Sequence, residues 1–193
     1  LKGKKKSGAI NVPEVKKLTW RVAQKKYSIP ALTVIEKNFP DNSTSVTLSI
    51  SEKFIPQHAT QNVLGYFKGT TSTDSFIVFT AHYDHLGMMG NQIYFPGAND
   101  NASGTSMLLN LVKYYSDSKH RPKSNLLFIA FAGEEAGLVG SKYFTEHPLI
   151  PLNKIRVLVN MDLMGTGDEG MMVVNATEYK KEFELLKEIN NAK

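Results

Sequence analysis

The chain has 193 residues, no cysteine and a formal net charge of +5. This length is enough for one sizeable hydrophobic core and part of a second unit. Without cysteine, the chain can form neither disulfides nor thiolate metal sites, so any metal ion must be held by carboxylate oxygens and imidazole nitrogens. No uninterrupted apolar run approaches the length that a membrane-spanning helix needs, so we expect no membrane span.

The positive charge is concentrated at the amino end. Residues 1–26 carry eight lysines and one arginine against a single acid, Glu14, which gives a local net charge of +8. Basic segments can bind nucleic acid, but these lysines are not interleaved with aromatic residues that could stack on bases. We therefore interpret the segment as a solvated surface and expect no nucleic-acid partner.

The first part of the chain predicts a small β-rich unit. Strands are expected over residues 29–34 and 46–50, with a polar turn over 40–43 between them. Residues 51–61 predict a connector to the segment that follows.

From residue 62 onward, predicted strands alternate with predicted helices. We expect strands over 63–67, 76–81, 125–132, 155–161 and 171–174, and helices over 102–116, 135–146 and 178–190. This alternation is typical of an α/β sheet with helices on both faces. In such sheets, ligands bind beyond the carboxyl ends of the strands, where His82, Glu134 and Asp162 follow apolar runs.

Two of these strand ends carry candidate metal ligands. His82 follows the run 76–81, and Asp84 lies two residues beyond it. A neutral imidazole is a good zinc ligand, and a nearby carboxylate can accept its second N–H and fix its tautomer. The alternative is a strand-end histidine with a local hydrogen bond. Asp162 follows the run 155–161, which suits either a metal ligand or a turn aspartate.

Two loops add further acids. Asp100 lies among small residues before a predicted helix, where the backbone can approach a ligand closely; alternatively, Asp100 or Asn101 caps that helix. Glu134 and Glu135 follow a buried strand, so one can bind a metal while the other acts as a base, or both belong to a first helical turn. Because crowded carboxylates repel one another and burying a charge is costly, we expect one or two divalent metal ions among them.

Taken together and in this order, the segments 80–87, 96–104, 131–137 and 159–165 resemble the motifs of metallopeptidase family twenty-eight, the co-catalytic zinc aminopeptidases. The resemblance covers about residues 62–190. It implies a three-layer α/β fold in which a mixed, mostly parallel sheet lies between helices, and it implies two zinc ions.

The same resemblance assigns roles to the candidate residues. It implies that His82 is a ligand of one zinc ion, that Asp162 is a ligand of the other, and that Asp100 bridges the two. Glu135 would complete one ligand set, beside either His82 or Asp162. Glu134 resembles the general base and Asp84 the partner that orients His82. The peptide bond between Asp100 and Asn101 is cis in the family.

The remaining histidines and two phenylalanines are interpreted without a role in the site. His85 is not a ligand in the family pattern, so we interpret it as a residue at the rim. We expect the others on the surface or in loops, namely His58, His120 and His147, and we expect Phe128 and Phe131 in the core rather than in a substrate pocket.

The resemblance also divides the chain into two parts. Residues 1–57 are interpreted as the tail of a β-rich, protease-associated-like insert, and residues 58–193 as the amino-terminal part of the catalytic domain. The family pattern includes a second histidine well beyond Asp162, yet no histidine follows His147. Together with a start at Leu1 rather than Met, this leads us to expect a trimmed, incomplete domain that is inactive alone although its parent is an enzyme.

The activity that the resemblance implies is a zinc-dependent aminopeptidase, which hydrolyses the amino-terminal bond of a peptide substrate. The alternatives are a glutaminyl cyclase with one zinc ion, a glutamate-releasing carboxypeptidase, and a non-catalytic binding domain like that of the transferrin receptor. No signal peptide is visible, but relatives with such an insert are usually exported. The resemblance thus implies a secreted or periplasmic parent.

Overall fold

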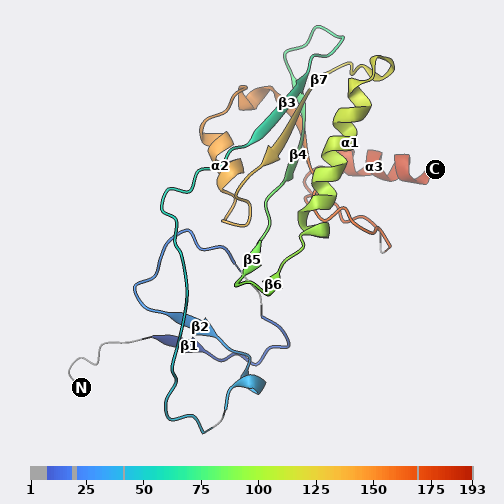
Figure 1. Cartoon of the computed structure of the whole chain (residues 1–193). Helices are drawn as coiled ribbons and strands as arrows, with labels where there is room; N and C mark the ends of the chain where they lie inside the picture. Colours follow the sequence, from blue (N-terminus) through green and yellow to red (C-terminus); the bar gives the residue numbers. More distant parts are fainter. Residues whose placement is uncertain (1–7, 19–20, 41, 169, 193) are drawn as a thin grey trace.

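A four-stranded sheet, in the upper part of Figure 1, lies between two helices. The computed structural model describes residues 8–18, 21–40, 42–168 and 170–192. The strand order is β3–β7–β4–β8, and the strands are β3 (Val63–Phe67), β4 (Phe76–His82), β7 (Asn125–Phe131) and β8 (Ile155–Asn160). β4 pairs in parallel with β7 and β8, whereas β3 is antiparallel to β7. The prediction of a mixed, mostly parallel sheet is confirmed.

Alternate residues of each strand pack on opposite faces of the sheet, as strand geometry requires. On one face, Ala81 of β4 joins Leu126 and Phe128 of β7 in one hydrophobic cluster. On the other face, Val78 of β4 joins the neighbouring β7 residues, Leu127 and Ile129, in a second cluster. Both faces are therefore apolar and need a covering layer.

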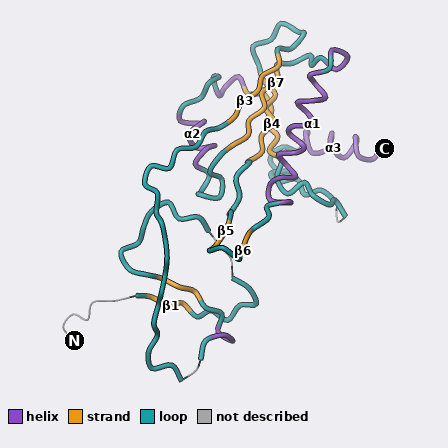
Figure 2. Tube along the Cα trace, viewed as in Figure 1, coloured by secondary structure: helices purple, strands orange, loops and turns teal. Residues whose placement is uncertain are grey.

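Helices supply that layer on each face. Helix α1 (Gly104–Ser116) packs on the first cluster through Leu108, and helix α2 (Val139–Glu146) packs on the second through Phe144. Figure 2 shows α1 and α2 on either side of the strands. The three-layer arrangement expected from the sequence is thus confirmed. The last helix, α3 (Lys180–Asn191), has no buried residue among those described.

Short elements complete the part of the chain that follows residue 62. A short hairpin pairs β5 (Met88–Met89) with β6 (Ile93–Tyr94), and each strand has two residues. A short π-helix, η2 (Ala98–Ser103), leads directly into α1. Two single-turn 3₁₀ helices follow later in the chain, η3 (Ser118–His120) and η4 (Leu152–Lys154).

One extra residue interrupts the pairing of β4 with β8. Phe76 lies opposite Ile155, but Ile77 lies opposite Val157, so Arg156 has no partner residue on β4. This is a β-bulge, which shifts the alternation of the residues that follow it.

Three sequence predictions of local structure are wrong. Residues 46–50 and 171–174 are not strands, and their side chains, such as Ile50 and Met172, are exposed, because no strand of the described chain lies beside them to accept their hydrogen bonds. The helix predicted from residue 135 begins only at Val139. The residues before it form a tight turn in which Gly137 and Leu138 have positive φ, which a helix cannot continue through.

The amino-terminal part is a small, exposed unit. It pairs β1 (Ala9–Asn11) in parallel with β2 (Ala31–Thr33) and contains one 3₁₀ turn, η1 (Glu36–Asn38). None of its described residues between 8 and 57 is buried. Residues 1–7 and 19–20 of the basic segment, and Asp41 of the predicted turn, lie outside the described residues. The assignment of residues 1–57 to an insert stays a prediction.

Within the described chain, the helices are all too short or too polar to cross a membrane.

Candidate metal centre

His82 lies at the carboxyl end of β4, and its side chain is only 5% exposed. It shares a strand face with Val78 and Thr80, so the alternation that buries the core also fixes the direction of the imidazole. Its Nδ1 atom is 3.0 Å from the main-chain oxygen of Asp84. A carbonyl oxygen can only accept, so Nδ1 carries the proton and Nε2 keeps its lone pair.

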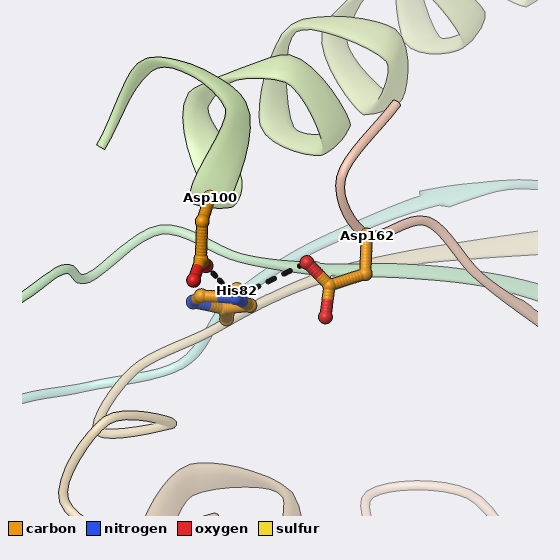
Figure 3. Close-up of side chains that lie close together, drawn as sticks. All are labelled: His82, Asp100 and Asp162. Atoms are coloured by element: carbon orange, nitrogen blue, oxygen red, sulfur yellow. Dashed lines mark ion pairs between the residues drawn. The ribbon is translucent and has the colours of Figure 1, made fainter. Parts of the chain in front are cut away.

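Two carboxylates face this lone pair (Figure 3). The Nε2 atom of His82 is 3.2 Å from Oδ1 of Asp100 and 3.6 Å from Oδ1 of Asp162. Ligands bound about 2.0–2.1 Å from a tetrahedral zinc ion are themselves roughly 3.3 Å apart. An unprotonated nitrogen and two carboxylate oxygens repel one another at such distances, unless a cation lies between them. The donor atoms and their spacing therefore fit zinc.

The structure places His82 and Asp162 around the same position. The sequence interpretation, in which these two residues serve different ions, is therefore not supported by the geometry. Their strands are neighbours in the sheet, and the main-chain N–H of Met161 donates to the oxygen of Thr80, which extends the pairing to the residue before Asp162. The side chains of His82 and Asp162 therefore lie at the same edge of the sheet and on the same face.

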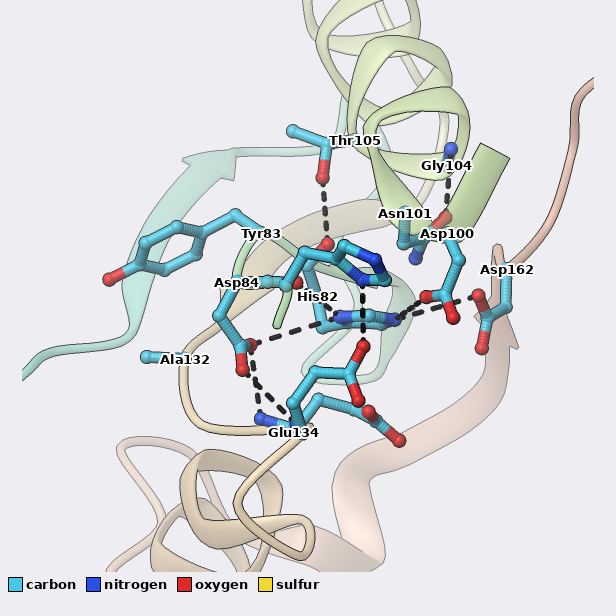
Figure 4. A network of polar contacts seen from close by, with 12 residues as sticks. His82, Tyr83, Asp84, Asp100, Asn101, Gly104, Thr105, Ala132, Glu134 and Asp162 are labelled. Carbon is cyan, nitrogen blue, oxygen red and sulfur yellow. Dashed lines mark hydrogen bonds and ion pairs between the residues drawn. The ribbon is translucent and has the colours of Figure 1, made fainter. Parts of the chain in front are cut away.

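Asn101, whose bond to Gly104 is drawn in Figure 4, holds the two aspartate segments together. It is 2% exposed, and its Nδ2 atom donates to the main-chain oxygen of Met161 over 3.0 Å. Its Oδ1 atom accepts from the main-chain N–H groups of Gly104 and Leu163. The bond to Gly104 is the helix cap that the sequence suggested as an alternative. The peptide bond between Asp100 and Asn101 is cis, as the family resemblance implied.

Asp84 positions the glutamate loop rather than the ring of His82. Its two carboxylate oxygens accept from the main-chain N–H groups of Glu134 and Glu135, over 3.0 and 3.1 Å. Its carboxylate is 3.8 Å from Nδ1 of His82, which is too long for a hydrogen bond. In this structure the main-chain oxygen of Asp84, not its carboxylate, is within hydrogen-bond distance of His82 Nδ1, and the role of the Asp84 side chain as partner of His82 stays a prediction.

Glu134 lies between the acidic cluster and an apolar cavity. The cavity has a volume of about 290 Å³, and its lining includes Glu134, His82, Phe131, Leu138 and Leu158. Burial raises the pKa of the Glu134 carboxyl above its ordinary value, and a positive charge on His82 would oppose this shift. Three nearby carboxylates also raise the pKa, those of Glu135, Asp162 and Asp100. A carboxyl with a raised pKa is suited to proton transfer near neutral pH.

Glu135 belongs to a second group of possible ligands. One ligand atom each from His85, Asp100 and Glu135 lie within 4.8 Å of one another. The side chain of His85 is 22% exposed and that of Glu135 is 17% exposed. His85 thus contacts the acidic cluster directly, and its interpretation as a rim residue without a role is not supported by this geometry.

The other residues singled out from the sequence lie in ordinary surroundings. His58 and His147 are exposed, and the ring of His120 stacks on that of Tyr114. Phe128 is buried in the core. Phe131 packs against Phe144, as expected of a core residue. It also lines the cavity beside Glu134, which the sequence interpretation did not expect.

The spacing of residues along the chain does not point to two polar side chains that brace the site, those of Asn62 and Thr105. The Asn62 side chain accepts from the N–H of Ala132 and donates to the oxygen of Gly140, which holds the turn after β7. The hydroxyl of Thr105 donates to the main-chain oxygen of His82. Together with Asn101, they act through contacts between distant segments, and no spacing along the chain reveals such contacts.

Comparisons with known proteins agree with these motifs. A family model described as Peptidase family M28 matches residues 62–193. A probable zinc metalloprotease of Pyrenophora teres f. teres is 36% identical over 113 residues, which cover 56% of this chain and 23% of the relative. Aminopeptidase YwaD of Bacillus subtilis is 30% identical over 155 residues, which cover 79% of this chain and 32% of the relative.

One solved structure is also similar to part of the chain. The crystal structure of BSAP, a zinc aminopeptidase from Bacillus subtilis, matches with a TM-score of 0.46 and 35% identity, and the match covers 56% of this chain and 25% of that one. The matched part of the chain spans about a quarter of the length of the Pyrenophora relative and about a third of that of the Bacillus relative.

Proposed function

The chain belongs to peptidase family M28, and from that premise we propose that the whole protein is a zinc-dependent aminopeptidase. It would hydrolyse the amino-terminal peptide bond of a peptide substrate. One observation carries the proposal. The three candidate ligands His82, Asp100 and Asp162 come from separate segments, yet they meet around one position, with Glu134 beside them.

The residues fit two zinc ions. His82, Asp100 and Asp162 would hold one ion, and Asp100 together with Glu135 would reach a second. When bound, zinc supplies the Lewis acidity that activates a water molecule and polarises the peptide carbonyl.

The chain's own residues would handle the proton. Glu134 would accept a proton from the attacking water and pass it to the leaving amine, as a general base and then a general acid. Asp84 would keep Glu134 in place through the hydrogen bond to its main-chain N–H. The apolar cavity next to Glu134 offers room for an apolar side chain of the substrate.

The test is Glu134→Gln in the full-length natural protein. We expect the rate of hydrolysis of an aminoacyl p-nitroanilide to fall by about 10²–10⁴-fold, because the proton acceptor is lost. Zinc content, measured by mass spectrometry, should stay unchanged. Glu146→Gln is the matched control, because Glu146 is an exposed glutamate at the end of α2. Near wild-type hydrolysis with zinc still bound would show that Glu134 is not the base.

Product analysis of the same protein separates the alternatives. A glutaminyl cyclase would convert an amino-terminal glutamine to a ring without releasing a residue. A carboxypeptidase would release glutamate from the carboxyl end, and a binding domain would give no product with any peptide.

We also propose that residues 1–57 belong to a protease-associated-like insert, and that the protein is secreted or periplasmic. The exposed, two-stranded unit and the start of the family match at residue 62 support this division. Recovery of the natural protein only in the cytoplasmic fraction of its source cells would contradict the proposed location.

A further inference from the structure

We propose that Gln24, a residue of the amino-terminal unit, is a positioning residue for Glu134, and that it acts by holding the turn that carries this glutamate. The inference rests on the proposed function, because it takes Glu134 as the general base. It gives the amino-terminal unit a part in the reaction, which its assignment to an insert does not include.

The turn after β7 is held by hydrogen bonds of its main chain. The carbonyl oxygen of Glu134 accepts from the main-chain N–H groups of Gly137 and Leu138, over 2.8 and 2.9 Å. The carboxylate of Asp84 accepts from the N–H groups of Glu134 and of the residue after it. The turn also depends on positive φ angles, which reach 95° at Gly137. These contacts fix the backbone of Glu134 itself.

Gln24 contacts the next part of the same turn. Its Nε2 atom donates to the main-chain oxygen of Ala136, two residues after Glu134. A Cβ atom placed on Gly137 would lie only 2.8 Å from the same Nε2 atom. The amide of Gln24 therefore lies directly against the turn, and glycine at position 137 leaves room for it. The contact joins two segments that are 112 residues apart in the chain.

The connector between the amino-terminal unit and the sheet is bound to the same region. The hydroxyl of Tyr83 donates to the main-chain oxygen of Gln61 over 2.7 Å, and the ring of Tyr83 points away from the acidic cluster (Figure 4). The next residue, Asn62, bonds to the N–H of Ala132 before the turn and to the oxygen of Gly140 after it. The connector thus fixes both ends of the turn, and Gln24 contacts its middle.

The position of this turn matters because a general base works only within hydrogen-bond reach of the proton that it takes. A displacement of about 1 Å, caused by a change away from the reacting atoms, can lower the rate by about 100-fold. The bond from Gln24 is exposed and neutral, so its effect should be smaller than this. Because Gln24 bonds to the main chain of the turn, we expect its loss to lower kcat and to leave KM nearly unchanged.

The first test measures hydrolysis of an aminoacyl p-nitroanilide by the full-length natural protein with Gln24→Ala or Gln24→Glu. The first variant removes the amide, and the second keeps its shape but has no N–H to donate. We expect kcat, normalised to zinc content, to fall by about three- to tenfold in both, the size of one hydrogen bond. KM should change by less than about twofold.

Lys25→Ala is the matched control. Lys25 is the exposed neighbour of Gln24, and its loss changes the net charge by the same amount as Gln24→Glu. We expect wild-type kcat in this variant. Wild-type kcat in the two Gln24 variants, or an equal fall in Lys25→Ala, would overturn the inference.

A double-mutant cycle separates positioning from a general structural effect. If Gln24 acts through Glu134, Gln24→Ala should not lower the residual rate of Glu134→Gln any further. The same fractional fall on both backgrounds would show that Gln24 only stabilises the protein, and the inference would be wrong. A fall in Glu134→Gln without any effect of Gln24 removes the inference alone, whereas unchanged hydrolysis by Glu134→Gln removes the proposed base as well.

Discussion

Asn101 shows how single residues set the geometry of the centre. Asp100 and Asp162 are exposed enough to move, with side chains that are 44% and 40% exposed. Their backbones are fixed because the buried Asn101 side chain bonds to the segment on either side of Asp162. These candidate ligands could be predicted from the sequence, since each follows an apolar run or lies in a small-residue loop. The hydrogen bonds of Asn101 that hold their segments together could not be predicted, because they form only once the segments meet in the fold.

Replacing Asn101 by alanine should destabilise the fold. The change removes three hydrogen bonds to main-chain groups, those of Met161 and Gly104 in buried surroundings and that of Leu163 in a partly buried one, and we expect the free energy of unfolding to fall by about 2–3 kcal/mol. Urea denaturation followed by circular dichroism measures this. Asn110→Ala is the control, because Asn110 makes one exposed bond within α1, and its effect should stay within about 0.5 kcal/mol. Equal effects of the two variants would contradict the role of Asn101.

At the scale of elements, parallel pairing brings the chemistry together. β7, β4 and β8 run in the same direction, so their carboxyl ends meet at one edge, where the polar residues that follow them collect. The near-continuous apolar runs of these strands and the helical spacing of apolar residues in α1 made them predictable. Strands were also predicted at 46–50 and 171–174, where apolar residues occur but no strand forms. Strand formation depends on pairing with a neighbouring strand, and local sequence does not reveal whether one lies beside the segment.

An ion pair joins the approaches to two of these strands at the opposite edge. Lys154, just before β8, contacts Asp74, just before β4, and the hydrogen bond and charge of Lys154 hold the pKa of the Asp74 carboxyl below its ordinary value. The stabilisation from this pair is therefore present above the ordinary pKa and is lost as the pH falls through the lowered pKa.

NMR titration of the Asp74 carboxyl carbon tests this contact. We expect its midpoint below 3.8 in the wild type and a return toward that value in Lys154→Gln. Lys142→Gln, which removes an exposed lysine of α2, should leave the midpoint unchanged. Because the pair is exposed, its effect on stability should be small. An unshifted wild-type midpoint would mean that the two side chains do not pair in solution.

At the scale of the whole molecule, the proposed metal centre joins segments from both layers of helices and from the sheet. β4 supplies His82, the loop before α1 supplies Asp100, the turn before α2 supplies the glutamates, and the end of β8 supplies Asp162. Ions bound there would couple these segments, and binding to the folded state alone raises its stability.

Zinc should therefore raise the thermal midpoint. At a concentration about 100-fold above the dissociation constant, binding adds about 2.7 kcal/mol, which corresponds to roughly 5–10 °C for a chain of this size. Differential scanning calorimetry with zinc and then with EDTA measures the change. His82→Ala should lose most of the zinc effect and His58→Ala none of it. A midpoint that zinc does not move in the wild type would contradict the proposed centre.

The bulge at Arg156 carries a consequence for this centre. Before it, Ile155 points into the α2 side of the sheet, and after it Leu158 and Asn160 point to that same side, together with Asp162. With unbroken alternation, Ile155 and Asp162 would lie on opposite faces of the sheet, because they are separated by an odd number of positions. The extra residue of the bulge shifts the alternation of β8 by one position. Ile155 at the start of the strand and Asp162 beyond its end therefore lie on the same face of the sheet. Deletion of residue 156 would restore the regular alternation and turn either Ile155 or Asp162 away from that face.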